Sequence, residues 1–191
     1  MTSPLQIFID ACLINNFVLA YFLGICPFLG VSTKTETAVR MGAALTFVMV
    51  VASICAFLID LALKAINAPY LHLISYIVVI ASAVQLVEMF VKKFSPVLFR
   101  ALGIYLPLIT TNCAILGLVL FQTSRGYHFV QCLAFAVGAG AGFTLALLIM
   151  SGIRERLELS DTSSVVQGAA IALMVAGILS MTFMGFAGMG R

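Results

Sequence analysis

This sequence has few charged residues. Charged side chains make up only 9% of its 191 residues, whereas soluble globular domains carry roughly a quarter. Hydrophobic residues make up 63%, and the mean hydropathy is +1.19. These values exclude an ordinary soluble domain and indicate a membrane protein. Because hydrocarbon has no water to bond the backbone, the spanning segments must be helices or a closed barrel, and the long apolar runs favour helices.

Several other features are absent. The Lys and Arg residues are scattered over short loops, so we expect no nucleic-acid partner. Residues 1–10 lack the basic region and cleavage site of a secretory signal, and we expect them to open the first span. The stretch from Gly138 to Gly142 is not a nucleotide loop, because no βαβ unit surrounds it. Its Gly-x-x-x-Gly spacing instead predicts close helix approach.

The predicted fold is all-α, a polytopic membrane protein of six transmembrane helices joined by very short loops. At roughly 20 residues per span, the chain has no room for an extramembrane domain. The predicted spans are 5–30, 38–62, 70–91, 97–121, 128–152 and 166–189.

Basic residues are divided unequally between the two ends of these spans, seven at one end and three at the other. Cytoplasmic loops are enriched in Lys and Arg. The bias therefore predicts that the first, third and fifth loops are cytoplasmic and that both termini lie outside. The seven are Lys34, Arg40, Lys92, Lys93, Arg100, Arg154 and Arg156, and the three are Lys64, Arg125 and Arg191.

An internal repeat relates the two halves of the chain. Cys26-Pro-Phe-Leu-Gly30 in the first span matches Cys113-Ala-Ile-Leu-Gly117 in the fourth, at an offset of 87 residues. Three spans per half is an odd number, so the second half enters the membrane from the opposite side. We therefore expect two inverted three-helix repeats, residues 1–95 and 96–191, within one integral membrane domain.

Helix-breaking residues surround both cysteines. A proline removes a helix donor and clashes with the preceding turn, so we expect the first and fourth helices to be broken. Unwound backbone is tolerated at membrane depth only where it is buried in protein or lines a cavity. The flanking residues are Gly24, Pro27 and Gly30 in the first span and Gly103, Pro107 and Gly117 around the second cysteine. The polar residues available to the unwound backbone are Asn15, Asn16, Thr110, Thr111 and Asn112.

Cys26 and Cys113 are the sharpest candidates for chemistry. A broken helix leaves free N–H groups and a positive dipole end, which stabilise thiolates and the sulfides of a cluster. Structural zinc ions and iron–sulfur clusters are each bound by four ligands. Two matched cysteines therefore imply that a second, similar chain supplies the other two. The alternative is that each is a small buried hydrophobic residue. That alternative is preferred for the unmatched cysteines, which are Cys12, Cys55 and Cys132.

Three acidic residues fall within or near spans, where a charge is costly and usually functional. Glu88 is a candidate for ion coupling, although Lys92 four residues later offers an ordinary ion pair. Asp60 has the same explanation in Lys64. Asp10 has no such partner, so we expect it to be exposed or paired with another subunit.

Two long segments resemble a known family. Residues 15–32 (NNFVLAYFLGICPFLGVS) and 106–117 (LPLITTNCAILG) look like the A-subunit family of the Rnf electron-transport complex. The likeness covers the whole chain. The E subunit of the sodium-pumping NADH:quinone reductase is a neighbouring family. It has Glu-Asn in place of Asn15-Asn16 and Thr in place of Pro27, so the Rnf resemblance is preferred.

The resemblance implies a six-span subunit of a complex in the bacterial cytoplasmic membrane, with both termini periplasmic. Such a complex couples electron flow between ferredoxin and NAD to sodium or proton movement. Cys26 and Cys113 match the residues that contribute to an intramembrane [2Fe–2S] cluster, shared with the homologous E subunit of opposite orientation. Glu88 matches the family's acidic residue in the third span. The flavins and remaining centres belong to other subunits (B, C, D and G), so neither flavin nor NAD is expected on this chain.

Two other functions fit the sequence pattern. Inverted repeats with broken helices also build small-solute and ion transporters, which predicts solute flux by this chain alone. A structural membrane scaffold predicts that cysteine substitutions leave electron transfer intact.

Overall fold

The computed structural model describes residues 3–32, 34–66, 72–94, 108–109, 111–158 and 169–185. Over these ranges the regular structure is helical and contains no strand, which confirms the all-α prediction. In chain order the elements are α1 (Pro4–Ile9), the π-helical turn η1 (Asp10–Ile14), α2 (Ile25–Val31), α3 (Thr35–Ile66), α4 (His72–Phe94), α7 (Cys113–Ser124), α8 (Phe129–Glu158) and α9 (Ala169–Met184).

Within the described residues, two helices, α3 and α8, are long and apolar enough to cross a membrane. Their apolar stretches, Thr35–Lys64 and Phe129–Leu157, have mean hydropathies of 2.5 and 2.2. They correspond to the predicted second and fifth spans. Helices α4, α7 and α9 are apolar over shorter lengths and overlap the predicted third, fourth and sixth spans. Residues 97–107 of the fourth span lie outside the described residues, and the division into two inverted halves stays a prediction.

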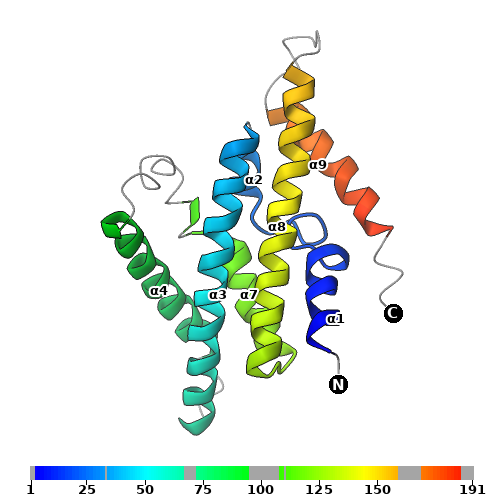
Figure 1. The fold of residues 1–191 in the computed structure, drawn as a ribbon. Helices are drawn as coiled ribbons and strands as arrows, with labels where there is room; N and C mark the ends of the chain where they lie inside the picture. Colours follow the sequence, from blue (N-terminus) through cyan, green and yellow to red (C-terminus); the bar gives the residue numbers. More distant parts are fainter. Residues whose placement is uncertain are drawn as a thin grey trace.

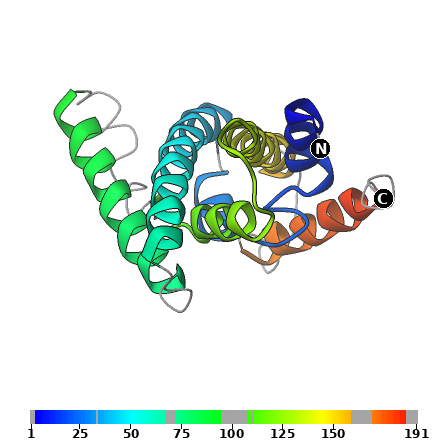
Figure 2. The ribbon, with the colours of Figure 1, turned by 90° about the horizontal axis from the view of Figure 1, so that it is seen from below.

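Helices α3 and α8 run side by side through the centre of the bundle (Figures 1 and 2). Glycine on each helix faces threonine on the other. A Cβ on Gly42 would lie 2.4 Å from Thr144 Oγ1, and one on Gly140 would lie 2.6 Å from Thr46 Oγ1. Both hydroxyls donate to carbonyls of their own helices. The helices therefore approach closely without leaving a polar group unpaired in the apolar interior.

The opposite face of α8 packs on α1 and η1. A Cβ on Gly138 would lie 2.7 Å from the Phe8 carbonyl oxygen, and one on Gly142 would lie 2.7 Å from that of Cys12. The close approach predicted from the Gly-x-x-x-Gly spacing is thus confirmed. Helix α4 lies on the outer side of α3, away from this contact (Figure 2).

The first predicted span is broken, as expected. Helical structure stops at Ile14 and resumes at Ile25, and the backbone between them takes positive φ at Phe22 (55°) and Gly24 (81°). Pro27 is not the cause. It lies in the first turn of α2, where a missing N–H breaks no helical hydrogen bond. The break lies upstream of this proline, and only its position near Cys26 was predicted correctly.

Polar side chains bond the unwound backbone. Asn16 is fully buried, and its Oδ1 accepts from the N–H of Val18 at 3.0 Å while its Nδ2 donates to the Gly142 carbonyl at 2.7 Å. From α9, Ser180 donates to the Leu19 carbonyl at 2.6 Å. Because an unpaired backbone group in an apolar interior is costly, these bonds hold the break in one conformation.

The position of the break makes Gly24 hard to replace. An added Cβ would lie 2.5 Å from Phe143 Cε2, and the φ of 81° strains any L side chain. We predict that Gly24→Ala destabilises the fold by about 1–3 kcal/mol, the usual cost of a left-handed non-glycine residue. The measurement is thermal unfolding in detergent. Gly30→Ala is the matched control, because nothing lies within 4 Å of a Cβ there; an equal loss in both variants would contradict the prediction.

Candidate functional site

Two helix starts meet at the break. Gly24 caps the N-terminus of α2, and Cys113 is the first residue of α7. The Gly24 N–H donates a hydrogen bond of 2.9 Å to Cys113 Sγ. Cys26 follows Gly24 by two residues, so the Cα atoms of Gly24 and Cys26 lie within roughly 8 Å of each other. The structure thus brings both matched cysteine segments to one place.

This meeting point lies halfway along the bundle. Gly24 packs against Phe143, which is near the middle of the 30-residue helix α8. From there α2 leads to Thr35, which bonds Glu155 near the C-terminal end of α8. Helix α7 instead leads to the end where α8 begins. The two helices therefore start at a common point and run to opposite ends of the molecule.

Both matched thiols are exposed on the surface of the chain, and neither forms a disulfide. Neither is thus a buried core residue of this chain, and their role as ligands stays a prediction. Cys132, by contrast, is buried, with 2% of its surface accessible. Cys12 and Cys55 have intermediate exposure. An exposed pair of sulfurs at mid-depth in an apolar bundle is available to a further group or chain.

Asn112, directly before Cys113, has one unused donor. Its Oδ1 accepts from the Ala114 N–H at 2.9 Å and so caps α7. Its Nδ2 has no acceptor among the described residues, although the residue is only 6% exposed. A buried donor left unpaired costs about 1–3 kcal/mol. Asn112 therefore caps a helix and does not bond unwound backbone as expected, and its second polar atom is left as a donor.

These residues fit half of an iron–sulfur or zinc site. Across the described ranges, no group of three or more His, Cys, Asp or Glu residues is arranged to hold a metal ion. Cys26 and Cys113 offer two sulfurs with one N–H already directed at Cys113. A four-ligand centre therefore needs two ligands from outside the described part of the chain.

The C-terminal end of α2 is held by α8, a contact that sequence reasoning missed. Arg154 donates to the Leu29 carbonyl at 2.8 Å and to Ser32 Oγ at 3.0 Å. Beside it, the N–H and the hydroxyl of Thr35 donate to Glu155 Oε1 at 3.0 and 2.8 Å. The only signal in the sequence was that two bases and an acid share the stretch after Gly152. The clamp fixes the direction of the short helix that carries Cys26.

The acidic residues have different outcomes. The predicted pair of Asp60 with Lys64 is confirmed at 2.6 Å. The prediction for Asp10 is wrong, because its carboxylate lies 3.6 Å from Arg125 within the same chain. Its other oxygen accepts from Asn15 at 2.8 Å, so this asparagine does not bond the unwound backbone as expected.

Glu88 lies on α4, but its side chain and that of its proposed partner Lys92 are outside the described part of the structure. The ion-coupling role assigned to Glu88 therefore stays a prediction.

Comparison with known proteins confirms the family resemblance. Residues 4–190 match the family described as Rnf-Nqr subunit, membrane protein. The A subunit of the ion-translocating oxidoreductase complex of Syntrophotalea carbinolica is 56% identical over 190 residues, which cover 99% of this chain and 98% of that protein. Proteins of the same name from Salmonella arizonae and Escherichia coli are 52% identical with the same coverage.

The exposure of the cysteines predicts their order of alkylation. In the chain purified without other subunits, N-ethylmaleimide in detergent should modify Cys26 and Cys113 before Cys132, because reactivity follows access to the sulfur. Mass spectrometry of peptides after short exposures measures the order. Modification of Cys132 first would contradict the geometry of the site.

Proposed function

The chain belongs to the Rnf-Nqr family of membrane protein subunits, and from this premise we propose that it is the electron-relay subunit of an Rnf-type ion-translocating oxidoreductase complex. It is not an enzyme on its own; its contribution is to hold a redox centre inside the membrane. The names of its relatives support the complex. The observation that carries the relay is the hydrogen bond from Gly24 to Cys113 halfway along α8.

In this proposal Cys26 and Cys113 supply two ligands to a [2Fe–2S] cluster. A homologous E subunit of opposite orientation supplies the other two. When bound, such a cluster accepts and releases single electrons. Support comes from the two exposed thiols, which make up half of a four-ligand set, and from their place at the meeting point of two helix starts.

The chain's own residues prepare this site for negative charge. The Gly24 N–H is already directed at Cys113 Sγ, and Cys113 sits at the positive end of the 12-residue helix α7. The unpaired Nδ2 of Asn112 is a second donor beside it. Arg154 holds the far end of α2, which carries Cys26. Donors fixed before an electron arrives need little rearrangement to stabilise it.

The depth of the site suits a relay. Helix α8 has 30 residues and is about 45 Å long at 1.5 Å per residue. A centre beside Phe143 divides that length into two halves of about 20 Å. Electrons entering from a partner on one face would then reach a partner on the other face in two shorter transfers.

We also propose the finer topology. The chain would form six spans in two inverted halves, in the bacterial cytoplasmic membrane with both termini periplasmic, and the B, C, D and G subunits would complete the complex. The opposite directions of α2 and α7 from a common start support the inversion. Glu88 on α4 is the candidate for ion coupling within this arrangement.

Substitution of the two cysteines tests the cluster. The complex purified with its homologous partner should show a [2Fe–2S] signal by electron paramagnetic resonance after reduction. Cys26→Ser and Cys113→Ser should each remove that signal and lower the iron content. Cys55→Ser is the control, because Cys55 lies on α3 outside the site. A signal that survives both substitutions sinks the assignment.

The unpaired donor of Asn112 makes a second prediction. Asn112→Ser keeps a side-chain oxygen able to cap α7 but removes Nδ2. Fewer donors near the thiolates should lower the reduction potential of the cluster by tens of millivolts, since about 59 mV corresponds to a tenfold change in a one-electron equilibrium. A redox titration followed by paramagnetic resonance measures it, with Gly30→Ala as control. An unchanged or higher potential would exclude the role given to Nδ2.

A further inference from the structure

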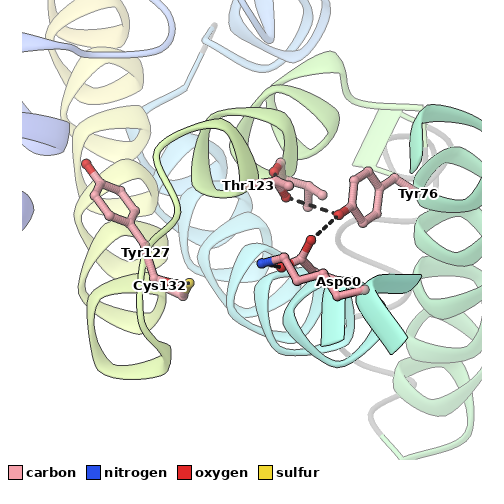
Figure 3. A network of polar contacts seen from close by, with 7 residues as sticks. Asp60, Tyr76, Thr123, Tyr127 and Cys132 are labelled. Atoms are coloured by element: carbon pink, nitrogen blue, oxygen red, sulfur yellow. Dashed lines mark hydrogen bonds and ion pairs between the residues drawn. The ribbon is translucent and has the colours of Figure 1, made fainter. Parts of the chain in front are cut away.

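A cavity of about 230 Å³, lined by both polar and apolar residues, lies away from the two cysteines. It is at the end of the bundle where α3 and α7 finish, and about 15 Å of helix separates Thr123 on its wall from Cys113. Figure 3 shows the polar contacts of Asp60, which is one of the lining residues. The lining residues are Phe57, Asp60, Leu61, Lys64, Gln122, Thr123, Gly126, Tyr127, His128 and Cys132.

Asp60 is the centre of a network contributed by three helices. Its Oδ1 accepts from the Tyr76 hydroxyl of α4 at 3.1 Å, and Thr123 Oγ1 of α7 lies 3.4 Å from that hydroxyl (Figure 3). Tyr76 is almost fully buried, with 1% of its surface accessible. The carboxylate is therefore held in place by a side chain that has little freedom to move.

The other oxygen of Asp60 carries a replaceable cation. Lys64 Nζ lies 2.6 Å from Oδ2, yet the Lys64 side chain is 66% exposed while that of Asp60 is 15% exposed. The anion is thus fixed in the wall, and the ammonium group sits at the mouth on a flexible stem. Because the Lys64 ammonium group is exposed to solvent, its attraction to Asp60 is screened, and a competing cation can displace it.

The charge and donor set of the cavity suit one kind of ligand. The Asp60 carboxylate and the Thr123 hydroxyl line the cavity, and such oxygen atoms favour hard cations. Asp60 supplies a single negative charge, which balances a monovalent ion and leaves a divalent one uncompensated. The C-terminal ends of α3 and α7 add negative dipole ends. Lys64 also lines the cavity, and its ammonium group is paired with the Asp60 carboxylate.

We propose that this cavity binds an alkali metal cation, which displaces the Lys64 ammonium from Asp60. The site is separate from the cysteines, and its occupation needs no redox centre. In an ion-translocating complex it gives ions a place to lose part of their hydration at this end of the subunit before they pass further.

Carbodiimide labelling tests the site in the intact complex. Dicyclohexylcarbodiimide modifies membrane carboxyl groups, and peptide mass spectrometry follows Asp60 in NaCl and in choline chloride at equal ionic strength. Na⁺ should slow the labelling of Asp60 and choline should not. Equal labelling in the two salts overturns the proposal.

Two substitutions sharpen the test. In Lys64→Met, the Na⁺ concentration for half-protection of Asp60 should fall by about two- to fivefold, the equivalent of an exposed ion pair. In Thr123→Val, the Na⁺ concentration for half-protection should rise, because an oxygen near the carboxylate is lost. Half-protection at the same Na⁺ concentration in both variants and in the unaltered complex contradicts the mechanism.

Glu36 is an internal control in every sample. Glu36 lies on the same helix as Asp60 and pairs with Arg40, four residues later, at 2.6 Å. Its side chain is 78% exposed and is not among the residues that line the cavity. Its labelling should not depend on Na⁺. Protection of Glu36 equal to that of Asp60 would mean a general salt effect and would overturn the assignment of a site.

Discussion

One hydrogen bond, from the Gly24 N–H to Cys113 Sγ, ties the first broken helix to the start of α7. It exists only because the backbone of residues 15–24 leaves the helical path. In hydrocarbon such backbone needs internal partners for its polar groups. Asn16 and Ser180 supply them from two other parts of the chain. The site therefore depends on a network that extends well beyond the two cysteines.

Small residues on α8 make that network rigid. Gly140 lets α3 approach on one face, and Gly142 lets η1 approach on the other, where Asn16 reaches the Gly142 carbonyl. Two close contacts on opposite faces leave α8 little freedom to shift. A helix fixed in this way is a suitable reference for both ends of α2, which meets Phe143 at its start and Arg154 at its finish.

The fold class and the two central helices could be predicted from the sequence because hydropathy and length alone decide them. The approach of the two matched cysteine segments could be predicted because the repeat is visible in the residues themselves. The cause of the break could not be predicted. Pro27 carries the stronger sequence signal, but a proline in the first turn of a helix does not break it. Asn16 acts through contacts that form only on folding. The ion pair of Asp10 with Arg125 was missed for the same reason, since no regular spacing links partners so far apart in sequence.

Halfway along the bundle, the described part of the chain on its own has polar groups without partners. Two thiols face outward, and the Nδ2 of Asn112 is buried with no acceptor in the described structure. In the proposed complex, a partner surface that brings an anionic centre would relieve both deficits. Because an unpaired buried donor costs about 1–3 kcal/mol, forming that contact stabilises the break as well as the complex. In the proposed complex, assembly with a partner and completion of the redox site would therefore be thermodynamically linked, and each should favour the other.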